Sequence, residues 1–224
     1  MNALSPLARR GLIVLLLFAV AVVAGYFIIR PSDRLPVYHP SQLDTRLVDP
    51  GVRAEEGEHH ITDFRLTDQR GLPLTLDSVR GRILLVDFFF TTCGSICPKM
   101  SSQMVRVQEA WRDEPRVLLL SHSVTPEMDS VPVLAAYAQR YGVDPAHWRL
   151  LTGDRAQIYR LARRSYFAAL DEGDGGPNDF VHTENFVLVD PQLRIRGFYD
   201  GTSAKDVDRA IDDIRNLLDE GSDH

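Results

Sequence analysis

Two cysteines and one distant histidine are the residues of this chain whose types and spacing point most directly to chemistry. Cys93 and Cys97 are the only cysteines among 224 residues, and Pro98 follows them where an amphipathic helix is predicted to begin. Spaced four residues apart at a helix start, both sulfur atoms can point the same way and meet in a disulfide or on one metal ion. The positive end of the helix also lowers the pKa of a nearby thiol, which favours thiol chemistry or soft-metal binding.

His182 is the predicted third member of this site. It follows an acidic, glycine-rich loop at 171–179 and precedes a predicted strand at 186–189, which would neighbour the strand that leads into the cysteines. Two thiolates and a neutral imidazole form a soft donor set that suits Cu(I) and can hold Cu(II) with an added ligand. A closed structural zinc site would normally need a fourth protein ligand, and none is evident in the sequence. Because a ligand on a glycine-rich segment must be drawn into place, we expect copper to order this loop.

Three other interpretations of the cysteine pair differ in how well they fit the sequence. A structural disulfide in so short a loop contributes only about 2 kcal/mol through chain entropy, which is a weak reason for the pair. In a thiol-disulfide oxidoreductase, one of Cys93 and Cys97 would attack a target disulfide and the other would resolve it, without any need for His182. A peroxidase of the peroxiredoxin type uses Thr-x-x-Cys with a proline before the cysteine, which Thr91-Thr92-Cys93 does not match.

Most of the other side chains that could bind a metal are expected to have different roles. His59 and His60 precede a predicted strand and are expected to be exposed. Met100 and Met104 have thioethers that suit Cu(I), but their spacing places them on the core face of the predicted helix. His122 comes just after the second predicted central strand, at the same sheet edge as the cysteines, which leaves a role behind the metal ligands open.

The pattern of apolar residues predicts an α/β sandwich of the thioredoxin-like type, with an N-terminal hairpin from Ile61 to Leu76. The uniformly apolar run at 83–90 predicts a central strand covered on both faces, and right-handed crossovers put the cysteine loop at its carboxyl end. Asp87 lies within this strand without an assignable partner, although burying an unpaired carboxylate is costly. The other predicted elements are the helix after Pro98, strand 117–121, helix 130–141, strand 148–151, helix 154–164, the antiparallel pair 186–189 and 193–199, and a final helix from 203.

An uncharged, apolar run at 11–29 follows Arg9 and Arg10 near the N-terminus. As a helix, its roughly 19 residues would span about 28 Å, close to the thickness of a bilayer's hydrocarbon core. A cleaved signal peptide is the rival interpretation, but the run is long for one. The two arginines favour an N-terminus in the cytoplasm. We therefore expect a cytoplasmic segment at 1–10, a single transmembrane anchor at 11–29 in the cytoplasmic (inner) membrane, and a C-terminal part on the periplasmic or extracytoplasmic side.

The rest of the chain divides into a linker at 30–57, which contains several prolines and scattered charges, and a folded domain at 58–224. The net charge of −6 and the absence of a long basic cluster argue against a nucleic-acid partner. Outside the cytoplasm an idle cysteine pair would form a disulfide. A reductant or a bound metal is therefore needed if the thiols are to stay reduced.

Taken together, these residues resemble the Sco/SenC family of membrane-tethered, thioredoxin-fold copper-binding proteins used in cytochrome c oxidase assembly. The matching stretches are 81–98, 123–130 and 181–191, within a likeness that begins near Ile61 and continues to the C-terminus. The resemblance implies that Cys93, Cys97 and His182 ligate copper. It also implies either delivery of copper to the CuA centre of oxidase subunit II or reduction of the cysteines of that subunit. Many members carry acidic residues between the cysteines and before the histidine, where this chain has Gly94-Ser95 and Val181.

Overall fold

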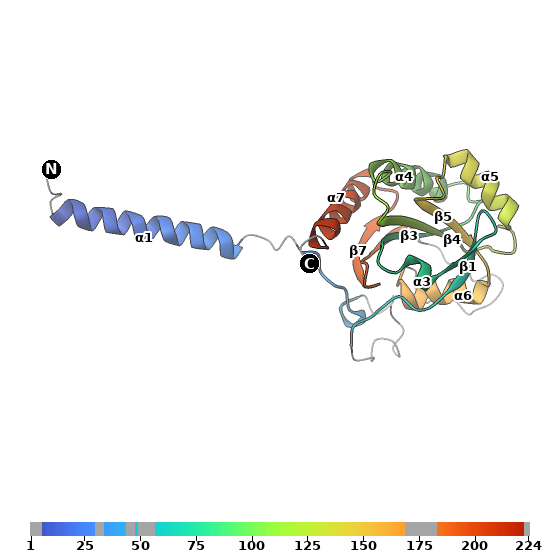
Figure 1. Ribbon diagram of the computed structural model, residues 1–224, viewed down its shortest axis with the longest axis horizontal. Coiled ribbons are helices and arrows are strands. Elements are labelled where there is room, and N and C mark those ends of the chain that lie inside the picture. The colour runs from blue at the N-terminus through green and yellow to red at the C-terminus, as the bar shows by residue number, and fades with distance from the viewer. Residues whose placement is uncertain (1–5, 30–33, 44–47, 49–56, 169–182, 222–224) are drawn as a thin grey trace. The chain divides into compact units, whose positions relative to one another are not determined.

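The computed structural model describes residues 6–29, 34–43, 48, 57–168 and 183–221 of the chain. The chain divides into two compact units, Met1–Asp33 and Arg34–His224. The described part of the first unit is helix α1 (Pro6–Ile29), and the second unit contains the mixed sheet and its covering helices (Figure 1).

Helix α1 covers the apolar run that was predicted to anchor the chain in a membrane. Its large apolar side chains between Leu12 and Val23 are more than half exposed. Among the residues that the structure describes, no helix combines the length and the apolar character needed to cross a membrane. The prediction of a helix is therefore confirmed, whereas the prediction of a transmembrane helix at 11–29 is not.

Within the described residues, seven strands of the second unit form one sheet in the order β2-β1-β5-β4-β3-β6-β7. The three central strands β3, β4 and β5 run parallel, and each of the other pairings is antiparallel. The predicted thioredoxin-like α/β arrangement with an N-terminal hairpin is thus confirmed. The strands are β1 (Arg65–Asp68), β2 (Pro73–Thr75), β3 (Ile83–Phe89), β4 (Val117–Ser123), β5 (Trp148–Thr152), β6 (Asn185–Val189) and β7 (Ile195–Asp200).

Two hydrophobic cores lie on opposite faces of this sheet, each covered by its own helices (Figure 1). One face is covered by α4 (Ile96–Ala110), α5 (Val131–Tyr141) and α7 (Ala204–Glu220). The other face is covered by α3 (Leu76–Val79), α6 (Arg155–Arg160) and the π-helical turn η2 (Leu161–Ser165). A short 3-10 helix, η1 (Pro40–Gln42), precedes the sheet.

Strand β3 is buried along its whole length because helices cover both of its faces. Successive side chains of a strand point to opposite faces, so Leu85 and Phe89 pack in the core beneath α4, whereas Val86 and Phe88 pack in the other core. The parallel pairing of β3 with β4 sets the direction of the strand, and with it the end of the sheet at which the cysteine loop begins.

Part of the predicted linker at 30–57 belongs to the second unit, and hydrogen bonds join it to the sheet. The backbone N–H of Tyr38 donates to the Ile195 carbonyl oxygen at 2.9 Å, which extends the edge at β7. Arg196 donates to the Leu35 carbonyl oxygen at 2.6 Å and also pairs with Glu220. Local sequence patterns could not show these contacts, since their partners lie about 160 residues further along the chain.

Candidate metal centre

Strand β3 delivers the cysteine loop to the start of helix α4. The backbone N–H of Cys93 donates to the Phe90 carbonyl oxygen at 3.3 Å, which closes a turn directly after the strand. Ser95 is the N-cap of α4, and Cys97 is the second residue of the helix. The backbone N–H of Cys97 donates to the Cys93 sulfur at 3.4 Å. The Cys93 sulfur therefore lies at the helix N-terminus, where backbone N–H groups have no partner within the helix.

The two cysteines are free thiols in different surroundings. Cys93 is partly exposed, whereas Cys97 is 3% exposed and packs in the core beneath α4. Partial burial opposes ionisation of Cys93, but hydrogen bonds from the Cys97 thiol, from backbone N–H groups and from the Ser95 hydroxyl lower its pKa to about 7. Burial raises the pKa of Cys97 to about 12, and the nearby Cys93 and Asp87 add to that shift. Cys93 is thus the thiol that ionises first.

We expect iodoacetamide to modify Cys93 well before Cys97 in the folded, reduced and metal-free chain, because Cys93 is both more exposed and more acidic. The thiolate fraction of Cys93 increases as the pH rises through its pKa, so its modification rate should increase about tenfold between pH 6 and pH 8 and then level off. Peptide mass spectrometry of quenched samples measures both rates. In the denatured chain the two cysteines should react alike, and equal rates in the folded chain would contradict the assignment.

The third predicted ligand, His182, lies outside the described residues. The chain is described again from Thr183, and β6 begins at Asn185. Strand β6 runs antiparallel to β3, with Val187 opposite Val86, so the beginning of β6 lies at the sheet edge where β3 ends. In the described parts of the chain, no three side chains of His, Cys, Asp or Glu gather closely enough to hold a metal ion. The described part of the site is therefore the cysteine pair and the strand that follows the predicted histidine.

His122 does not lie behind the cysteines but in the core on the other face of the sheet. Its ring stacks on Phe88 with a centroid distance of 5.0 Å and lies 5.6 Å from the ring of Tyr166. Among the described residues, neither ring nitrogen has a hydrogen-bond partner. Burial lowers the pKa of His122 to about 4, so the ring is neutral. The packing of His122 therefore gives it no contact with the cysteines, because its side chain points away from the face that holds Cys97.

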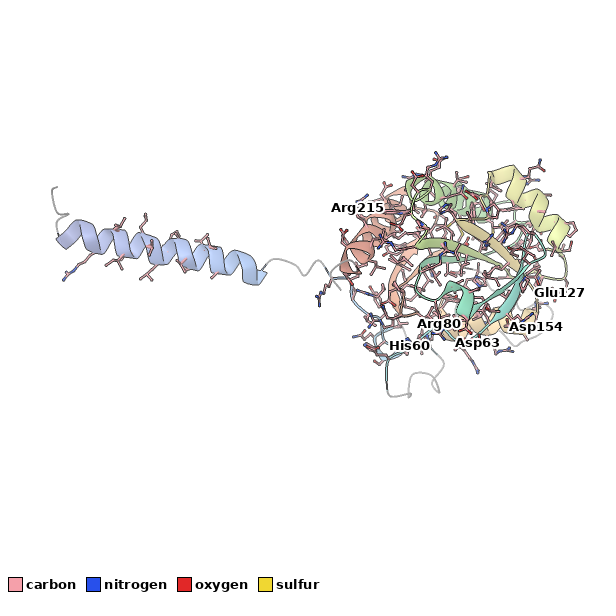
Figure 2. The ribbon with its side chains drawn as sticks, in the orientation of Figure 1. His60, Asp63, Arg80, Glu127, Asp154 and Arg215 are labelled. Atoms are coloured by element: carbon pink, nitrogen blue, oxygen red, sulfur yellow. The ribbon has the colours of Figure 1, made fainter. Side chains whose placement is uncertain are left out.

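The packing or the exposure of the other candidate metal ligands explains their positions. Met100 and Met104 are fully buried, which confirms their predicted place on the core face of α4. His59 is partly buried rather than exposed, because its Nε2 forms a hydrogen bond with the Ser165 carbonyl oxygen. His60 is exposed as predicted, and Figure 2 shows it at the surface of the second unit.

Asp87 lies on the face of β3 that is covered by α4, which is the face that also holds Cys97. In the sheet it is paired with Ser121 of β4. Its side chain is 1% exposed, and its Oδ1 has no hydrogen-bond partner among the described residues. Burial raises the pKa of Asp87 to about 7, and the Ser121 hydroxyl only partly offsets this effect. The carboxylate also raises the pKa of Cys97, which places it within electrostatic reach of that thiol.

Asp129 is a residue of this region that sequence reasoning missed. Its buried carboxylate accepts hydrogen bonds from Thr91 of the cysteine loop and from two hydroxyls near the end of β4. The only signal in the sequence was its place within the stretch 123–130. An aspartate in a turn gives no sign of its partner when that partner lies 38 residues away.

Proteins of known sequence or structure are similar to this chain over most of its length. A family model described as SCO1/SenC matches residues 52–219. A SCO1 protein homolog of Bacillus subtilis is 30% identical over 160 residues, which cover 70% of this chain and 82% of that protein. A solved structure of BsSco, described as a member of the Sco family of cytochrome c oxidase assembly proteins with a disulfide switch, has 30% identity and a TM-score of 0.61, over 71% of this chain and 94% of that one. Bradyrhizobium japonicum ScoI with copper bound has 27% identity and a TM-score of 0.57, over 70% of this chain and 99% of that one.

Proposed function

The chain belongs to the SCO1/SenC family, and from this premise we propose that it is a copper chaperone for the assembly of the CuA centre of cytochrome c oxidase. One copper ion would be bound by Cys93, Cys97 and His182 and passed to oxidase subunit II or a similar CuA protein. The observation that carries this proposal is the pair of free thiols at the start of α4, one of them partly exposed. Support also comes from the copper that is bound to a similar protein of known structure.

The donor set fits copper in its chemistry. Two sulfur ligands and one imidazole suit Cu(I), which prefers soft ligands and low coordination numbers. With a pKa of about 7, Cys93 offers a thiolate near neutral pH, whereas Cys97 keeps its proton until a metal displaces it. Copper binding in this proposal therefore releases a proton from Cys97. The partial exposure of Cys93 leaves the bound ion within reach of a partner protein.

A copper competition titration tests the ligand set. We expect the reduced full-length chain to bind one equivalent of Cu(I) against a chromogenic chelator, and His182→Ala to weaken that affinity by at least about tenfold, since even groups behind the ligands are worth that much. His60→Ala is the matched control, because His60 is exposed and forms a hydrogen bond with the Gln192 carbonyl oxygen in the β6–β7 turn. Unchanged affinity in His182→Ala would remove that residue from the site.

The second candidate function is thiol-disulfide exchange with the cysteines of the oxidase subunit or of another extracytoplasmic protein. It is favoured by the difference between the two thiols, since an accessible thiolate at Cys93 could attack while the buried Cys97 resolves the mixed disulfide. His182→Ala separates the two functions. It should reduce copper binding while leaving the rate at which the chain reduces a disulfide-bonded CuA domain unchanged.

We also propose that segment 11–29 holds the chain at the cytoplasmic membrane, with the second unit on the periplasmic or extracytoplasmic side. The segment is uncharged, and the described apolar side chains of α1 are exposed. Continuous exposed apolar surface of this kind is typical of membrane or protein contacts. Fractionation of cells that express the full chain tests the proposal. Recovery in the soluble fraction, equal to that of a variant without residues 1–29, would contradict it.

A further inference from the structure

One buried carboxylate joins the cysteine loop to the loop between β4 and α5. Asp129 is fully buried, and it accepts hydrogen bonds from the backbone N–H of Thr91 at 3.2 Å and from the Thr91 hydroxyl at 2.5 Å. It also accepts hydrogen bonds from the hydroxyls of Ser123 at 2.6 Å and Thr125 at 3.0 Å. Among the described residues no lysine, arginine or histidine pairs with it, so the hydrogen-bond donors to this buried side chain are all neutral groups.

The contact with Thr91 is the point at which the cysteine loop is fastened. Thr92, Gly94 and Ser95 are exposed, and between Thr91 and the start of α4 only Cys93 is partly buried against the core. Thr91 lies inside the turn that the hydrogen bond from Cys93 to Phe90 closes. A loop whose side chains are mostly in solvent keeps one conformation only where hydrogen bonds hold it.

The path from Asp129 to the sulfur is therefore continuous. Asp129 accepts hydrogen bonds from Thr91, and Thr91 is a central residue of the turn that the hydrogen bond from Cys93 to Phe90 closes. This turn places the Cys93 sulfur where the backbone N–H of Cys97 donates to it at 3.4 Å. Glu127, two residues before Asp129, is exposed at the surface in Figure 2, whereas the Asp129 side chain is directed inward to these donors.

We propose that Asp129 is a positioning residue that holds the Cys93 sulfur in the geometry required for copper binding, an inference that rests on the proposed function. Without this anchor the turn samples other conformations, and the two sulfurs meet on one ion less often. Groups that orient metal ligands typically change metal affinity by about 10–100-fold, which is the loss we expect.

The experiment compares full-length, reduced variants by Cu(I) competition, by the thiolate-to-Cu(II) absorption band and by thermal unfolding. Asp129→Asn and Thr91→Val should weaken Cu(I) binding by about 10–100-fold and change the absorption band. Thr91→Ser keeps the hydroxyl and should retain the parental affinity and band. Thr91→Val keeps the test decisive if Asp129→Asn does not fold.

Asp190→Asn is the matched control for a buried aspartate. Asp190 is also fully buried and accepts hydrogen bonds from backbone N–H groups and arginines, but it lies after the end of β6, at the edge of the sheet opposite the cysteine loop. Its substitution should lower the unfolding temperature and leave copper affinity unchanged. Parental affinity in Thr91→Val, or an equal loss of affinity in Asp190→Asn, would overturn the proposal.

Failure of the proposed function gives a different result. If the parent chain binds no copper, the chaperone assignment fails, and the positioning of Cys93 is read from its modification by iodoacetamide at pH 7. Thr91→Val should then change the Cys93 rate while Thr91→Ser does not. Equal rates in the parent chain and in both variants would overturn the positioning role as well.

Discussion

Cys97→Ser is expected to lower the Cu(I) affinity of the full-length chain by more than about 100-fold, because groups that only orient ligands already account for about 10–100-fold. A serine hydroxyl is a hard ligand that keeps its proton, so it cannot replace a thiolate on a soft ion. Cys93→Ser should cause a loss of the same order, since both sulfurs are needed for the proposed ligand set. Competition against a Cu(I) chelator of known affinity measures both variants.

The control for this loss is Lys99→Ala, an exposed position two residues after Cys97 on the same helix. It changes the local charge of α4 without touching a thiol, so its copper affinity should stay close to that of the parent. Thermal unfolding of each metal-free variant separates a lost ligand from a lost fold. Tight, stoichiometric copper in folded Cys97→Ser would show that the cysteine pair does not form the site.

Asp87→Asn is expected to remove a pH-dependent loss of stability that the parent chain suffers between pH 5 and pH 8. Burial raises the pKa of Asp87 from its ordinary value of 3.8 to about 7, so the folded chain holds this proton more tightly than the unfolded chain. The resulting stabilisation is complete below about pH 4 and is lost as the pH rises through about 7. Between pH 5 and pH 8 the parent should lose about 3 kcal/mol in its free energy of unfolding from this group.

Urea unfolding of the reduced, metal-free parent and variant at pH 5 and pH 8 measures this difference. The free energies of unfolding of the two chains should diverge mainly at pH 8, where the parent carries a buried carboxylate and the variant a neutral amide. Asp63→Asn is the matched control, because Asp63 is exposed and labelled at the surface in Figure 2. An identical pH dependence in the parent and in Asp87→Asn would show that Asp87 is not buried in its charged form above pH 7.

Sequence reasoning identified the central elements because their signals are local. The run at 83–90 was predicted as a buried central strand, and β3 spans Ile83–Phe89. The core positions of Met100 and Met104 followed from helical spacing in the same way. The short helix α3 was not predicted, because four residues carry no recognisable periodic pattern. The helix predicted at 154–164 is present as α6, and its last turn has the π-helical form of η2.

The surroundings of two buried polar residues could not be predicted from sequence patterns. His122 lies at the cysteine edge of the sheet, as expected, but alternation along β4 turns its side chain into the core on the opposite face. Asp87 was recognised as anomalous, yet only its packing explains its raised pKa. In both cases the surroundings of the side chain depend on the face of the sheet to which it points and on the helices that cover that face.

The sequence by itself determined the chemistry of the candidate site. Two cysteines spaced four residues apart, between a buried strand and a helix start, specify paired sulfurs whatever the rest of the chain does, since that geometry is local. The sequence also predicted the strand after His182 beside the strand of the cysteines, and the pairing of β6 with β3 confirms it. Only the tertiary structure decided that Cys93 is accessible and acidic while Cys97 is buried, and that Asp129 accepts hydrogen bonds from Thr91. Burial, strand order and long-range hydrogen bonds arise when distant segments pack together, and no local pattern records which segments those will be.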